Sequence, residues 1–168
     1  MSFVVCGFFY FGNEPLRDRQ TEIGTLLVRA ALAQHLFIHL GLSVRALESA
    51  WDILEIPQGR LSGDRIPFSI TESPLDIDAD SLIVPFVNQE ELLRQNVARV
   101  HGFLASVWTI PELDRVSVYI SEGYDDIFDE RHVELADFEV IAVKEILAAS
   151  GPTSISGPSP KLVLTRPN

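Results

Sequence analysis

Two histidines, His35 and His39, lie four residues apart in a segment with a helical apolar pattern. On a helix this spacing can bring both imidazoles to one face and to one metal ion, which would serve metal-assisted hydrolysis. The zinc-protease pattern also needs a glutamate directly after the first histidine, and Leu36 occupies that position. A third ligand would have to come from His101, His132 or a carboxylate. The competing interpretation is that both histidines end a helix, where cations are favoured.

Three alternate aspartates, Asp76, Asp78 and Asp80, are similar to the first half of a calcium-binding loop. An EF-hand needs glycine at the sixth position and a bidentate glutamate at the twelfth. Ser81 and Val87 hold those positions, so the EF-hand pattern fails. A solvated connector whose aspartates keep a strand edge from pairing explains the residues more simply. A divalent-ion site remains the alternative.

Nucleophilic catalysis has little support in the sequence. Cys6 is the single cysteine and lies inside an apolar run, with no adjacent base to activate its thiol. The chain has no GxSxG turn, and its ten glycines form no phosphate-binding loop. Asp125 and Asp129 could form a glycosidase-like acid–base pair, but so dense a run of acids is typical of an exposed face, because burying unpaired carboxylates is costly. We therefore predict that the protein is not an enzyme and needs no cofactor.

The segment from Glu122 to Glu139 concentrates negative charge. Its only base is Arg131, so its charge is −7, against −11 for the whole chain. The eight acids are Glu122, Asp125, Asp126, Asp129, Glu130, Glu134, Asp137 and Glu139. Apolar side chains alternate with them, among them Tyr124, Ile127, Phe128, Val133, Leu135 and Phe138.

Part of this charge has an ordinary explanation. We expect Asp129, Glu130 and Glu134 to lie within one turn of a helix start, where carboxylates are favoured. The remaining acids, with their aromatic neighbours, indicate a protein interface, because aromatic residues anchor interfaces and charge steers encounter. The predicted binding residues are Glu122, Tyr124, Asp125, Asp126, Phe128, Asp129 and Glu130.

Composition limits the classes of protein. A length of 168 residues with 46% apolar residues and a mean hydropathy of +0.17 predicts one compact domain. A pI near 4.7 argues against direct binding to nucleic acid or to an anionic membrane surface. No apolar run reaches the ~20 residues of a membrane-spanning helix, and no basic region precedes the apolar start, so we predict no signal peptide. A single cysteine fits a reducing cytoplasm.

Periodicity predicts the elements that must position these residues. Three segments predict helices: Thr21–Leu40 ending at Gly41, Gln89–Trp108 with an Asn88/Glu91 capping box, and Glu134–Ala149, where a strand is the alternative. Ser43–Ile56 is ambiguous, with a helix ending before Pro57 as one interpretation. The predicted strands are Phe3–Phe11, Ile66–Thr71, Ser81–Val87 and Arg115–Ser121.

These elements predict an α+β fold, with α/β as the alternative, in which about four to five strands pack with three to four helices. We expect residues 1–149 to form the globular domain. Residues 150–168 are rich in Ser, Gly and Pro and predict a mobile tail, although Lys161 to Thr165 could dock as a short strand.

For function we expect an acidic, cytoplasmic, immunity-protein-like inhibitor that occludes the cationic cleft of a basic protein, such as a toxin or a nucleic-acid enzyme. One alternative is a metal-assisted hydrolase that uses His35 and His39 with carboxylates. The other is a structural or oligomerising module with an acidic, solubilising face. The sequence does not specify an oligomeric state.

Overall fold

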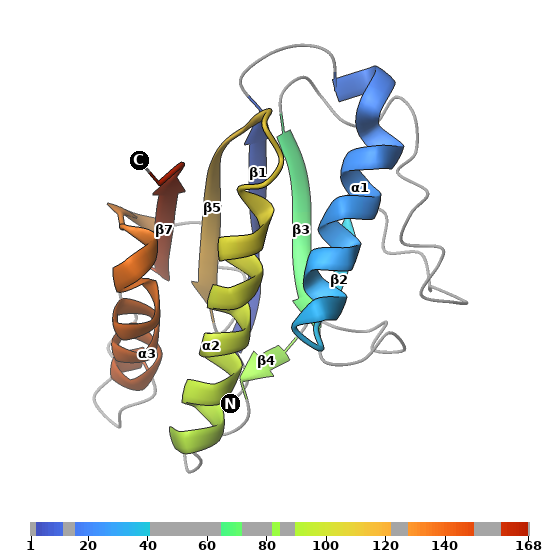
Figure 1. Cartoon of the computed structure of the whole chain (residues 1–168). Helices are drawn as coiled ribbons and strands as arrows, with labels where there is room; N and C mark the ends of the chain where they lie inside the picture. Colours follow the sequence, from blue (N-terminus) through green and yellow to red (C-terminus); the bar gives the residue numbers. More distant parts are fainter. Residues whose placement is uncertain are drawn as a thin grey trace.

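The computed structural model describes residues 3–11, 16–40, 65–71, 82–84, 90–121, 128–149 and 159–167. Their strands form one seven-stranded sheet in the order β2-β3-β1-β5-β7-β6, with β4 paired to β1. Helices α1, α2 and α3 cover one face of this sheet (Figure 1). The predicted α+β class is confirmed, with more strands than expected. The strands are β1 (Phe3–Phe11), β2 (Phe37–Leu40), β3 (Arg65–Thr71), β4 (Leu82–Val84), β5 (Leu113–Ser121), β6 (Phe128–His132) and β7 (Ser159–Thr165), and the helices are α1 (Leu16–Ala33), α2 (Glu90–Val107) and α3 (Phe138–Ala149).

The chain order explains the sheet. β1, α1, β2, β3, α2 and β5 follow the split β-α-β arrangement of ferredoxin-like sheets, in which β3 lies between β2 and β1. Every described strand pair in this part is antiparallel. The remaining chain adds β6, α3 and then β7, which enters between β5 and β6 and runs parallel to β6.

The core lies between the helices and one face of the sheet. In β1 the side chains of Val5, Phe9 and Phe11 are buried, while Phe8 and Tyr10 on the opposite face are partly exposed, as the two-residue period of a strand requires. The strand predicted over Phe3–Phe11 is confirmed as β1, which lies between β3 and β5 in the sheet. At Gly7 the backbone of β5 comes so close that an added Cβ would clash with the carbonyl oxygen of Ser117.

Helix α1 ends earlier than predicted, and the predicted helix over Thr21–Leu40 is wrong after Ala33. The amide of Leu36 donates to the Ala31 carbonyl and the amide of His35 to the Leu32 carbonyl, each at 3.0 Å. With φ of 57° at His35, these bonds form a Schellman motif in which His35 takes the position usually held by glycine. After Leu36 the chain continues as β2 (Phe37–Leu40), which pairs with β3.

The other predicted elements can be compared directly. The helices predicted over Gln89–Trp108 and Glu134–Ala149 are confirmed as α2 and α3, the latter preceded by the 3₁₀ turn η2 (Leu135–Asp137). The strand predicted over Arg115–Ser121 is confirmed as β5, and the strand predicted over Ser81–Val87 is present as the shorter β4.

Two predictions need correction. The mobile tail is wrong for Ser159–Thr165, because β7 pairs with strands on both sides, and the alternative of a docked strand is confirmed. Asp129 and Glu130 belong to β6 and not to a helix start. The ambiguous segment Ser43–Ile56 lies outside the described residues.

Candidate functional site

The net charge of the protein is divided unequally between the elements and the segments that join them. The described residues contain twelve carboxylic acids and eleven Lys or Arg side chains, which gives −1. The other residues contain twelve acids and only two bases, which gives −10 of the total −11. The packed elements are therefore nearly neutral, and the connecting segments carry the surplus.

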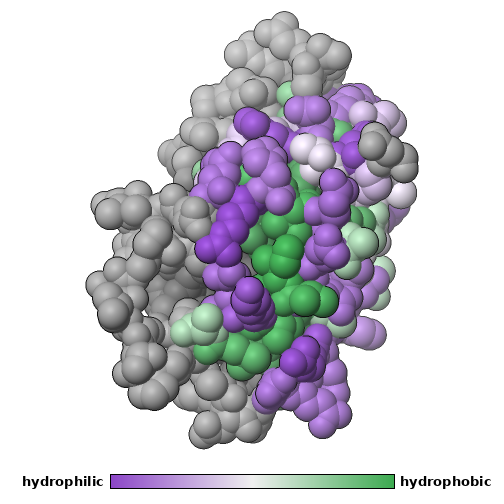
Figure 2. Space-filling model, turned by 90° about the vertical axis from the view of Figure 1, so that its left-hand side faces the viewer, coloured by the Kyte–Doolittle hydropathy of each residue, from purple (hydrophilic) through white to green (hydrophobic). Residues whose placement is uncertain are grey.

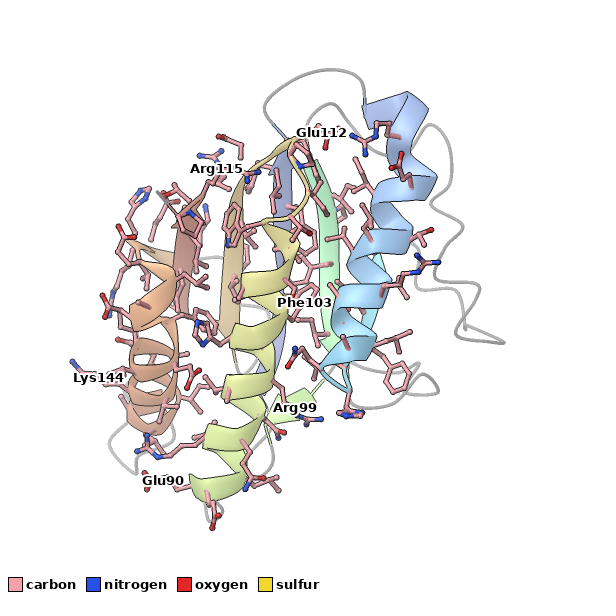
Figure 3. The ribbon with its side chains drawn as sticks, in the orientation of Figure 1. Glu90, Arg99, Phe103, Glu112, Arg115 and Lys144 are labelled. Atoms are coloured by element: carbon pink, nitrogen blue, oxygen red, sulfur yellow. The ribbon has the colours of Figure 1, made fainter. Side chains whose placement is uncertain are left out.

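The two most acidic connecting segments are joined to the same end of the sheet. Residues 72–81 carry −4 and follow β3, and residues 122–127 carry −3 and follow β5. In the ladders, Ile70 near the end of β3 lies opposite Val5, and Ser121 at the end of β5 lies opposite Val4. Both segments therefore leave the sheet where β1 begins. We call this the acidic end; β4 lies there too, and α2 starts there with Glu90 and Glu91 exposed (Figures 1 and 3).

The predicted partner-binding residues lie in the sequence between β5 and the start of β6, and the structure describes only some of them. Glu122, Tyr124, Asp125 and Asp126 lie outside the described residues. The remaining three, Phe128, Asp129 and Glu130, form the first residues of β6, opposite Ser159, Pro160 and Lys161 of β7. The acidic loop is thus anchored at both ends in strands of one sheet, β5 before it and β6 after it.

Glu130 is the predicted binding residue whose side chain is described. Its carboxylate accepts a hydrogen bond from the Nζ of Lys161 at 2.7 Å. This hydrogen bond lowers the pKa of Glu130 and raises the pKa of Lys161, each from its ordinary value. Glu130 is therefore already paired within the chain, and its charge is less available to a partner than the sequence suggested.

The second half of the acidic segment contributes to packing. The carboxylate of Glu139 on α3 lies 2.5 Å from Nδ1 of His101 on α2. Arg131 on β6 binds Glu145 on α3 at 2.5 Å. Glu134 is the residue before η2 but makes no capping hydrogen bond with its side chain. The concentrated charge of Glu122–Glu139 thus separates into a loop attached to the acidic end and a set of residues that hold α3 in place.

The histidine pair does not have the geometry that the metal prediction required. His35 lies in the turn after α1 and His39 lies in β2, so the two residues do not share a helix face. The His35 carbonyl instead accepts a hydrogen bond from Arg99 at 3.2 Å. Within the described residues, no three His, Cys, Asp or Glu side chains are grouped so that they could hold a metal ion. Asp76, Asp78 and Asp80 lie outside those residues.

The sheet face away from the helices carries a row of aromatic and cationic side chains that the sequence analysis missed. Arg115 lies 4.2 Å from the ring centroid of Tyr10, and Lys161 lies 5.7 Å from that of Tyr119. The Phe8 ring lies between the two tyrosines, 6.1 Å from each. The alternation of aromatic residues along β1 was the available signal. This row helps to hold the lysine that pairs with Glu130.

Helix α3 has an apolar surface that the sequence analysis also missed. Val140 is 71% exposed, the most of any large apolar side chain in the described residues. Ile141 and Leu147 are partly exposed beside it. Figure 2 looks onto the side of the molecule where α3 covers β7 and β6, and shows an apolar band between polar residues. The apolar residues of α3 on more than one side of the helix were the signal for this surface.

The described helices include none that is both long and apolar enough to cross a membrane. Comparisons with protein-family models, with curated proteins and with solved structures give no match for this chain, so its site is interpreted from its own residues and geometry.

Proposed function

We propose that the protein binds and neutralises a basic protein, as an immunity protein or another toxin inhibitor does. The loop from Glu122 to Glu130 would contact a cationic cleft of the partner, with Tyr124 and Phe128 as aromatic anchors. The function is binding and not catalysis, and we place it in the cytoplasm.

The observation that carries the proposal is the position of the surplus charge. The elements are nearly neutral, and two segments with −4 and −3 are joined to the end of the sheet where β1 begins. Charge gathered at one end of a molecule attracts an oppositely charged partner and orients it before contact. An acidic surface needed only for solubility has no reason to be gathered in this way.

The scaffold supports the same interpretation. Binding residues are often carried by loops whose ends are fixed by a rigid framework. Here the flanking strands β5 and β6 belong to the same sheet, and β7 lies between them. Arg131 and Lys161 further tie β6 to α3 and β7 through their ion pairs with Glu145 and Glu130.

The test compares two variants with the same change in charge. Asp125→Lys/Asp126→Lys reverses the loop, and Glu22→Lys/Asp114→Lys reverses two exposed acids elsewhere; each moves the net charge from −11 to −7. Each variant and the wild type are used to capture partners from a native host extract at low and high salt. We expect a basic protein to be captured by the wild type and the control pair, and to be lost with the loop pair.

High salt should weaken the capture, because the approach is steered by charge. Purified partner and inhibitor are then titrated, and the activity of the partner is followed. If Asp125→Lys/Asp126→Lys captures and inhibits the partner as well as the wild type does, the loop is not the binding site. A partner that is captured but not inhibited would contradict neutralisation.

A further inference from the structure

The outer face of α3 is unusual for a helix at the margin of a sheet. The inner residues Phe138, Ala142, Val143 and Ile146 are buried against the core. The outer face, which we define by five residues, contains three apolar side chains and only two charges. These residues are Asp137, Val140, Ile141, Lys144 and Ala148. An apolar helix of this kind is normally covered on both sides, and exposed apolar patches mark interaction sites.

The spacing of the five residues places them along one side of the helix. Steps of three and four residues keep side chains on one face. Asp137, Val140, Lys144 and Ala148 are exposed, and Ile141 is partly buried. Lys144 points away from the rest of the protein (Figure 3). Neither Asp137 nor Lys144 has an ion-pair partner among the residues that the structure describes.

We propose that this outer face binds the same face of a second copy of the chain, with the two α3 helices antiparallel. A two-fold axis that passes between residues 140 and 141 sets Asp137 of each copy opposite Lys144 of the other. The same axis packs Val140 against Ile141 of the second copy. The face is thus complementary to itself in both charge and apolar surface, as an isologous interface requires.

The charges of the face also argue for this occupant over a basic partner. A strongly basic protein would oppose Lys144 with like charge, whereas a second copy pairs it with Asp137. The net charge of −11 does not prevent the contact, because −10 of it belongs to residues outside the described elements. The inference does not depend on the proposed inhibitor function, since it uses a different surface.

Self-association is tested by sedimentation equilibrium and light scattering over a range of protein concentrations. We expect the wild type to form dimers as the concentration rises, and Val140→Asp to weaken the dimer about tenfold or more, because it places a charge at the apolar centre. Leu92→Asp is the control, because Leu92 on α2 is an exposed apolar residue (38%) outside this face. Leu92→Asp should dimerise as strongly as the wild type.

Charge exchange tests the antiparallel register. Asp137→Lys and Lys144→Asp should each weaken the dimer when alone, because each places like charges opposite one another. An equimolar mixture of the two variants should associate again, because every 137–144 contact then pairs opposite charges. A wild type that stays monomeric at all concentrations overturns the proposal. So does a mixture that associates no better than its components, or a dimer that Val140→Asp leaves unchanged.

Discussion

The two ends of the sheet differ in what charge does for the molecule. At the end opposite the acidic end, the guanidinium of Arg166 lies over the ring of Trp108 and donates hydrogen bonds to four backbone carbonyls that follow α2. At the acidic end, the turn after α1 is closed by backbone hydrogen bonds and by one from the Arg99 side chain to the His35 carbonyl, and the adjoining segments carry −7 with no base. A charge at one end is bound to the backbone, whereas most of the charge at the acidic end is a surplus of carboxylates with no base in the same segments.

A charged residue that donates several hydrogen bonds to backbone carbonyls contributes to the free energy of unfolding, and its removal lowers that free energy. A charged residue without such a task can be reversed at little cost in stability. Substitutions of Arg166, His35 and Glu130 measure how much each residue contributes to the free energy of unfolding.

The largest expected effect on the free energy of unfolding comes from substitution of Arg166. Arg166→Ala removes charge-assisted hydrogen bonds to the carbonyls of Trp108, Ile110, Pro111 and Leu113. We expect the free energy of unfolding to fall by about 2 kcal/mol, measured by urea denaturation. Arg166→Lys should lose most of the same stability, because the compact ammonium lacks the planar fork whose two nitrogens reach carbonyls on different residues. If the lysine variant is as stable as the wild type, charge and not geometry is what Arg166 supplies.

The second largest effect on the free energy of unfolding is expected at His35, in the turn after α1. His35 has a φ of 57°, which glycine adopts without strain and other residues adopt at a cost. His35→Gly should raise the free energy of unfolding by about 0.5–1 kcal/mol, while His35→Val should lower it by a similar amount or more. Thermal and urea denaturation of both variants provide the measurement. A loss of stability in the glycine variant would mean that the imidazole itself contributes at this position.

The smallest effect concerns Glu130 and depends on pH. Its folded pKa is lowered by Lys161, so the pair contributes stability that is present above the unfolded pKa, about 4.3, and is lost as the pH falls through the folded pKa. Glu130→Gln should therefore be slightly less stable than wild type at neutral pH. The two proteins should converge as the pH falls below the lowered folded pKa of Glu130. Denaturation midpoints from pH 7 to pH 3 test this, and a constant difference across that range would exclude the pair as its source.

Local patterns predicted most of the fold. The five apolar residues of α2 at steps of three and four, and the strict alternation in β5, specify their elements without help from distant residues. The segment after Ala33 could not be assigned in this way, because a short apolar run fits a helix or a strand equally well. Its pairing with β3 decides the outcome, and β3 begins more than twenty residues later.

The candidate site was predictable only as a concentration of charge. That Glu130 pairs with Lys161 depends on β7 reaching the sheet beside β6, which no local pattern reveals. The same holds for Glu139, whose contact with His101 needs α2 and α3 to be neighbours. The sequence identifies which residues are acidic, and the topology decides which of them are used internally.

The place of β7 has a consequence for how the protein is made. β7 is the last of the described strands, yet it lies inside the sheet and separates β5 from β6. During synthesis β6 therefore has no described strand neighbour until residues 159–165 have left the ribosome. Because long-range strand pairing is slow and open strand edges aggregate, we expect the nascent chain to need protection until residues 159–165 emerge. Any deletion from the C-terminus that removes β7 should leave an edge in the middle of the sheet.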